Sequence, residues 1–175
     1  TIPNLPHESV PYGTCPDHNV VRRQWGAMPD LPFEPLQHQD IGEKLGVIDL
    51  AAGSCLSGRG FVVLRGDGAR LSRALVQLML DLHRAQGYEE IAVPYLVGRE
   101  CMIGTGQLPK LAEDMFLCEK DDLFLIPTAE VPLTNLFREM ILDGDRIPVK
   151  VTAATPCFRR EAGSYGQDTK GLVRV

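Results

Sequence analysis

A long amphipathic helix is the feature that most constrains the fold of this 175-residue chain. Residues 69–86 carry apolar side chains at helical spacing, and Gly87 follows as a stop signal. Residues 88–93 are then a predicted strand that ends at Pro94. The apolar arc is wider than one packing face requires and includes Leu71, Leu75, Val76, Leu78, Met79, Leu80 and Leu82. The pattern therefore fits a helix in the interior and equally a helix that meets a partner subunit.

The segment before this helix divides into an irregular lead and the start of a domain. Residues 1–35 contain seven of the chain's 13 prolines, which excludes a long helix there and predicts an extended lead. Residues 36–45 have helical spacing, with Gly46 as the stop. We therefore expect a lead at 1–35 and a core domain over 36–175.

A hairpin and a further helix are predicted after the long helix. Two apolar runs, 116–118 and 123–126, flank a charged tetrapeptide, which is typical of a β-hairpin. A Thr-Ala-Glu run at 128–130 follows Pro127, and apolar spacing continues to Ile141. Thr128 is well placed to cap the N-terminus of this helix, and capping is the structural alternative to a functional role for this residue.

The last segment, residues 149–175, concentrates the chemistry. A predicted strand at 149–155 leads to Phe158-Arg159-Arg160-Glu161, and a polar loop over 162–171 separates it from a second strand at 172–175. Arginine forks hold phosphate and carboxylate oxygens bidentately, and a glutamate accepts from an exocyclic amine. The cluster suits a nucleotide and a carboxylate that meet in one place. The alternative is a salt-bridge set on an edge hairpin.

Composition limits the remaining classes of function. A net charge of −5 argues against a chain-wide phosphate-binding surface. The absence of a long apolar run predicts no membrane span, and cytoplasm is the expected location. Five cysteines without paired spacing indicate reduced thiols and no metal site within this chain.

Four strings in this sequence resemble one family. The run TPCFRREAGSYGQDTKGLVRV at 155–175 resembles motif 2 of class II aminoacyl-tRNA synthetases, in the version of the seryl-tRNA synthetase family. The strings that agree with it are LIPTAEVPLTN at 125–135, GTGQLPK at 104–110 and IPNLPHESVP at 2–11. The resemblance implies an α+β fold with an antiparallel sheet flanked by helices. It also implies a partial catalytic core that is truncated inside motif 2.

The resemblance implies an activity and a set of site residues. The activity is ATP-dependent formation of seryl-adenylate and transfer of serine to the acceptor end of tRNA(Ser), and also of tRNA(Sec). The residues that it assigns to serine binding are Thr128, Ala129, Glu130 and Arg159, of which Arg159 is also catalytic. The residues that it assigns to ATP are Arg159, Arg160, Glu161 and Val175.

The resemblance also extends to motif 1, and it implies further parts that lie outside residues 1–175. Residues 69–94 are similar to motif 1, which implies a homodimer with Pro94 at the interface. The carboxylate that holds Mg²⁺ is expected beyond residue 175, and motif 3 and the tRNA-gripping helical hairpin are also expected elsewhere. An isolated piece of this length is expected to have little activity.

Three rival functions stay open at this point. The first is a catalytically inactive paralogue of the family that acts as a binding or dimerisation module. The second is an atypical zinc-dependent branch that charges a carrier protein, against which the Thr-Ala-Glu run speaks. The third is a plain dimerisation domain, which leaves the Arg-Glu cluster unexplained.

Overall fold

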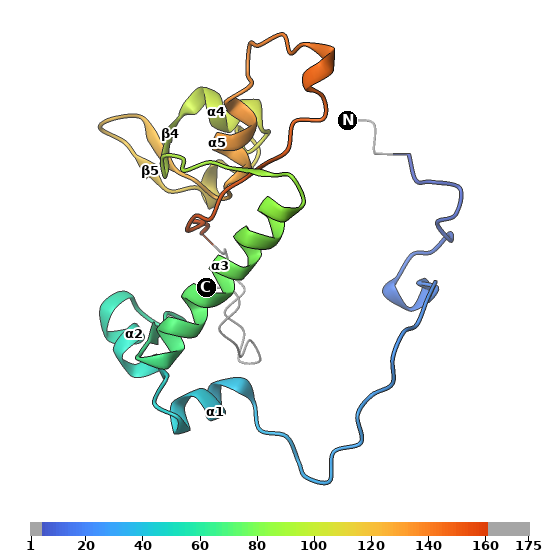
Figure 1. The fold of residues 1–175 in the computed structure, drawn as a ribbon, viewed down its shortest axis with the longest axis vertical. Coiled ribbons are helices and arrows are strands. Elements are labelled where there is room, and N and C mark those ends of the chain that lie inside the picture. The colour runs from blue at the N-terminus through green and yellow to red at the C-terminus, as the bar shows by residue number, and fades with distance from the viewer. Residues whose placement is uncertain (1–4, 161–175) are drawn as a thin grey trace. The chain divides into compact units, whose positions relative to one another are not determined.

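The structure is a computed structural model that describes residues 5–160, and the chain divides into the units Thr1–Pro35 and Leu36–Val175. The described part of the first unit, residues 5–35, is irregular, and its one helical turn is the 3-10 helix η1, Pro16–His18 (Figure 1). Its side chains are exposed. The described part of the proline-rich lead therefore contains no long helix.

The second unit combines one long helix, α3, with short helices and short strands (Figure 1). Its helices are α1 (His38–Lys44), α2 (Leu50–Ser57), α3 (Asp67–Ala85), α4 (Arg99–Gly104) and α5 (Glu130–Asn135), with 3-10 turns η2 (Ala112–Asp114) and η3 (Gly144–Arg146). Its strands are β1 (Ile48–Asp49), β2 (Val63–Leu64), β3 (Glu89–Glu90), β4 (Leu96–Gly98), β5 (Leu117–Cys118), β6 (Leu123–Leu125) and β7 (Val151–Thr152).

Most of the strand pairing is antiparallel. The largest sheet among the described residues has the order β4-β6-β5, with Val97 opposite Phe124 and Leu117 opposite the same residue on the other side. Strands β1 and β2 form a second antiparallel pair. The exception is β3, which pairs with β7 in parallel. The α+β class, the antiparallel sheet and the hairpin at 116–126 are confirmed.

The described core lies between the three-stranded sheet and helices α4 and α5. Met102, Ile126 and Val131 are completely buried there. The other members of this core are Val97, Leu108, Met115 and Phe124. Because Ile126 and Val131 flank the Thr-Ala-Glu run, that run is held on both sides by the best-packed residues of the unit.

Helix α3 confirms the long helix expected from the sequence, and Gly87 follows it at φ +84°. Only glycine adopts this left-handed conformation without strain, so the residue suits the end of a helix. The apolar stripe, however, lies open within the described part of the chain. Leu71, Leu78 and Leu82 each expose more than half of their surface. The structure therefore does not bury this face of α3.

Two predictions about element boundaries are wrong. The helix expected to reach Ile141 ends at Asn135, because the next residues form tightened turns and Glu139 takes a positive φ of 62°. The strand expected over 149–155 is paired only at Val151–Thr152. Its expected hairpin partner, residues 172–175, lies outside the described residues.

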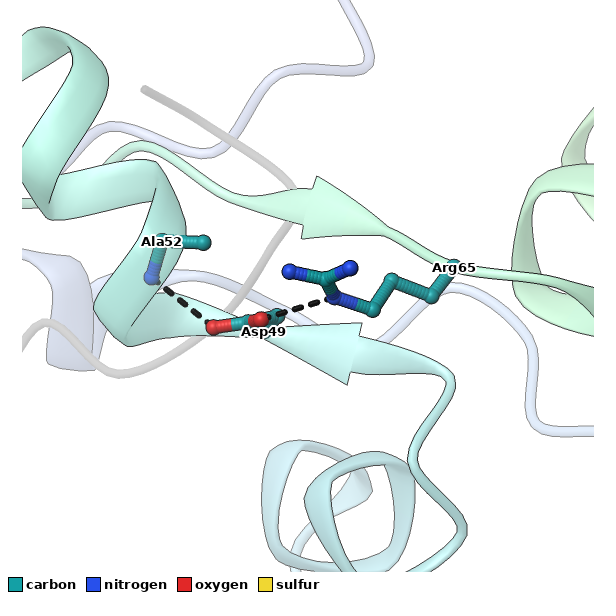
Figure 2. A network of polar contacts seen from close by, with 3 residues as sticks. All are labelled: Asp49, Ala52 and Arg65. Atoms are coloured by element: carbon teal, nitrogen blue, oxygen red, sulfur yellow. Dashed lines mark hydrogen bonds and ion pairs between the residues drawn. The ribbon is translucent and has the colours of Figure 1, made fainter.

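Asp49 joins α2 to the β1-β2 pair (Figure 2). Its Oδ1 accepts a hydrogen bond of 2.8 Å from the Ala52 amide, which makes it the N-cap of α2. Its Oδ2 accepts one of 2.8 Å from Nε of Arg65. The amide bond, and then the guanidinium, lower the pKa of the Asp49 carboxyl below its ordinary value of 3.8.

The Asp49 carboxylate makes a pH-dependent contribution to stability. Because its pKa is lowered in the folded state, the contribution is present above about pH 4 and is lost as the pH falls through the folded pKa. Asp49→Asn keeps an acceptor for Ala52 and removes the charge. We expect the variant to unfold at a lower temperature than the parent at neutral pH, with a difference that shrinks below pH 4. A difference independent of pH would contradict this account.

Gly53 allows the closest backbone approach of α2. A Cβ at this position would lie 2.3 Å from the carbonyl oxygen of Phe61 and 2.7 Å from Cα of Val62. We expect Gly53→Ala to lower the free energy of unfolding by about 1–3 kcal/mol, although alanine favours helices. Gly144→Ala is the control, because an added Cβ at Gly144 has no atom within 4 Å and its φ lies outside the left-handed region. Equal stability of both variants in urea unfolding would refute the close contact.

Candidate active site

The site is built where the segment 157–160 lies against the end of strand β6. The Phe158 amide donates to the Ile126 carbonyl oxygen at 2.8 Å, and Nε of Arg159 donates to the Pro127 carbonyl oxygen at 3.0 Å. Ile126 and Pro127 are fully buried, so both acceptors sit on a rigid base. The structure thus brings Arg159 directly beside the Thr-Ala-Glu run, 31 residues earlier in the chain.

Among residues 5–160, the orientation of Arg159 leaves most of its donors available. A guanidinium has five N–H donors, and the bond to Pro127 uses the one on Nε. The side chain is otherwise exposed. Its two terminal amino groups can therefore form the bidentate contacts that phosphate and carboxylate oxygens accept.

The Thr-Ala-Glu run forms the entry to helix α5. The N-cap is Ala129 and not Thr128, which lies one residue earlier and accepts a hydrogen bond of 3.3 Å from the Glu130 amide. Glu130 is exposed in the first turn, whereas Val131 behind it is buried. The fold therefore fixes the backbone of the run and leaves the Glu130 carboxylate accessible.

A hollow of about 640 Å³ adjoins this run. Thr128 and Ala129 contribute to its wall, as does the segment 152–157 that leads to Phe158. Helix α3 supplies the remaining lining residues, Val76, Met79, Leu80 and His83. Sequence analysis did not assign these four residues to the site. Their spacing of three or four residues marks one helix face, but it does not show what that face meets.

The second arginine, Arg160, contacts a different part of the unit from Arg159. Its guanidinium carbon, Cζ of Arg160, lies 4.2 Å from the centroid of the Phe116 ring, and its amide donates to the Asp114 carbonyl oxygen at 2.8 Å. Arg159 and Arg160 are neighbours in sequence, yet they contact different parts of the unit.

The other predicted site residues are less informative. Glu161, Val175 and the loop 162–171 lie outside the described residues. Pro94 is exposed and follows the short pairing of β3 with β7. Among residues 5–160 no group of three or more His, Cys, Asp or Glu side chains is placed to hold a metal ion. No helix in the same range is long and apolar enough to cross a membrane.

Comparison with known proteins defines the class first. The sequence model of the tRNA synthetase class II core domain (G, H, P, S and T) matches residues 116–175, which include the β5-β6 hairpin, the Thr-Ala-Glu run and the two arginines. The matched segment thus resembles a class II tRNA synthetase core domain, and it contains both Thr128 and Arg159.

The relatives narrow the class. The chain is 55% identical to the serine–tRNA ligase of Citrifermentans bemidjiense over 175 residues, which is 99% of this chain and 42% of that protein. It is also 55% identical to the serine–tRNA ligase of Gloeobacter violaceus, covering 100% of this chain and 41% of that protein. The chain therefore spans about two fifths of the curated relatives that it matches.

Solved structures agree with the relatives. Seryl-tRNA synthetase from Pyrococcus horikoshii complexed with ATP superposes with a TM-score of 0.88 at 34% identity, covering 99% of this chain and 43% of that one. The cytoplasmic enzyme from Naegleria fowleri in complex with AMP gives 0.84 at 31% identity, covering 97% and 40%. This chain belongs to the seryl-tRNA synthetase family.

Proposed function

We propose that this chain contributes the serine- and ATP-binding part of a serine–tRNA ligase. The complete protein then forms seryl-adenylate and transfers serine to tRNA(Ser), and also to tRNA(Sec). The observation that carries the proposal is the hydrogen bond from Nε of Arg159 to the Pro127 carbonyl, which holds a phosphate-binding side chain beside Thr128. The relatives named serine–tRNA ligase, and the neighbours solved with ATP and AMP, support the same reaction.

The chemistry of adenylate formation fits this set of residues. The ionised carboxylate of serine attacks the α-phosphorus of ATP, a P–O bond forms, and the bond to the leaving pyrophosphate breaks. No proton has to be removed from the nucleophile, so a general base is not needed. Positioning and charge stabilisation provide the catalysis, which suits a site of arginines and glutamates.

The residues divide between the two substrates. Arg159 contacts both the α-phosphate and the serine carboxylate, and therefore holds the reacting groups together. The Thr-Ala-Glu run, Thr128, Ala129 and Glu130, binds serine, and the exposed Glu130 carboxylate suits its ammonium group. The triplet Arg159, Arg160 and Glu161 holds ATP, with one further contact from Val175.

Further components belong to the same proposal. Mg²⁺ would be held mainly by a carboxylate beyond residue 175, and it would supply positive charge to the triphosphate. Two copies pair through residues 69–94, with Pro94 at the interface, which would cover the open apolar stripe of α3. The protein acts in the cytoplasm.

The alternative, an inactive paralogue, has no observation in its favour. Both the Thr-Ala-Glu run and the Arg-Arg-Glu run are intact, and the hydrogen bond from Arg159 to the carbonyl of Pro127, the residue before Thr128, supports an active enzyme. A module that only dimerises has no need of this arrangement. The two experiments below separate these functions.

Removal of the Arg159 guanidinium tests the catalytic assignment. We expect Arg159→Ala, in the complete protein, to reduce serine-dependent ATP–pyrophosphate exchange by roughly a hundred- to a thousandfold, because it removes charge stabilisation at the reacting phosphate. Arg59→Ala is the control, since Arg59 is an exposed arginine in the turn between α2 and β2. Near-normal exchange in Arg159→Ala, or no exchange in the parent, would sink the assignment.

Neutralisation of Glu130 tests the serine site. We expect Glu130→Gln to raise the KM for serine by roughly tenfold to a hundredfold, because a charged hydrogen bond to the ammonium is lost, while the KM for ATP changes little. Glu119→Gln removes an exposed carboxylate in the β5-β6 turn and serves as the control. The measurement is the same exchange assay with each substrate varied in turn. A rise confined to the KM for ATP would place Glu130 elsewhere.

A further inference from the structure

The Arg160 guanidinium already has a partner within the fold. Its Cζ lies 4.2 Å from the Phe116 ring centroid, within the roughly 6 Å at which a cation is attracted to an aromatic face. The Arg160 amide also donates to the Asp114 carbonyl oxygen at 2.8 Å. Both the backbone and the side chain of Arg160 are therefore attached to the same short stretch, residues 114–116.

Phe116 is itself held firmly. Its side chain is half-buried, and its carbonyl oxygen accepts a hydrogen bond of 3.0 Å from the Leu125 amide. Met115 beside it is 5% exposed and belongs to the core. The ring is thus a fixed platform at the start of β5, and a planar guanidinium on it is restricted in turn.

We propose that Arg160 is a positioning residue and that Phe116 is its partner. Phe158 is fixed to Ile126 on one side of Arg159, and Arg160 is fixed to residues 114–116 on the other. Arg159 lies between these two anchors, and its terminal amino groups are aimed by them. The inference rests on the proposed function for the role of Arg159, and it gives Arg160 an indirect part in the ATP-binding triplet, through the orientation of Arg159.

A positioning role for Arg160 can be distinguished from a direct phosphate contact, because it depends on the planar guanidinium and on the Phe116 ring. A lysine ammonium can neutralise a phosphate as a point charge, but it cannot stack its plane on a ring. If Arg160 is a positioning residue, replacement of either the guanidinium or the ring must lower the activity. The loss in the double variant must then be smaller than the sum of the two single losses. A direct phosphate contact depends on the cation alone.

The test is a double-mutant cycle in the complete protein with Phe116→Leu and Arg160→Lys. Serine-dependent ATP–pyrophosphate exchange is measured with each substrate varied, and urea unfolding is measured in parallel. We expect each single variant to lower kcat/KM by roughly two- to fivefold, for serine and for ATP alike, because Arg159 serves both substrates. The kcat/KM of the double variant should be no lower than that of the more impaired single variant.

Two further variants make the result specific. Phe116→Tyr keeps the aromatic face and should retain parental kinetics. Phe137→Leu makes the same change as Phe116→Leu at another half-buried phenylalanine, one without an arginine or lysine over its ring in the described part of the chain. It should leave the kinetics unchanged.

Several outcomes would overturn the proposal. One is a rise in the KM for ATP alone in Arg160→Lys with no effect of Phe116→Leu, which indicates a direct phosphate contact. Another is a shift of the urea midpoint with unchanged kinetics, which indicates a purely structural pair. If the parent shows no serine-dependent exchange, the proposed function fails. The urea midpoints of the four proteins then still test the contact between Arg160 and Phe116. Non-additive changes of the midpoint support the contact, and additive changes refute it.

Discussion

The hydrogen bond from the Phe158 amide to the Ile126 carbonyl is the contact on which the candidate site depends. It joins two segments that are 32 residues apart, and it places Arg159 where its Nε reaches the next carbonyl, that of Pro127. The acceptors do not move, because Ile126 and Pro127 are fully buried between the sheet and helix α5. A site that holds two substrates within reacting distance needs this kind of support, because a loosely held arginine keeps its charge but does not keep the required orientation.

A second constraint connects this contact to the long helix. The parallel pairing of β3 with β7 ties the residues that follow α3 to those that lead into the site, through bonds such as that from the Ile91 amide to the Thr152 carbonyl. The same face of α3 then lines the hollow next to Thr128. The open apolar stripe and the border of the hollow thus lie on one helix, and Val76 and Met79 belong to both.

The sequence predicts the elements whose signals are local. Helix α3 has a full amphipathic period and a glycine stop, and the β5-β6 hairpin has two apolar runs around a charged turn. The end of α5 is not predicted, because apolar spacing continues to Ile141 while Asn135 turns its side-chain amide back to the Val131 and Cys101 carbonyls. The resemblance assigns Thr128 and Arg159 to one site, and the fold attaches Arg159 to the carbonyl of Pro127, the residue before Thr128. The α3 lining and the Phe116 platform depend on contacts between distant segments, which no local pattern encodes.

Two adjacent arginines raise an electrostatic problem that the fold resolves. Like charges in neighbouring residues repel, and the repulsion grows where protein excludes water. Within residues 5–160 the structure separates their partners: Arg160 lies on the Phe116 ring, and the Arg159 side chain donates a hydrogen bond to a carbonyl. A carbonyl dipole and an aromatic face each stabilise a cation without cancelling its charge, in contrast to a carboxylate. The positive charge of Arg159 therefore remains available to an anionic ligand, and the neighbouring charge strengthens the local field. Pairing of either arginine with an acidic side chain would have removed this property from the site.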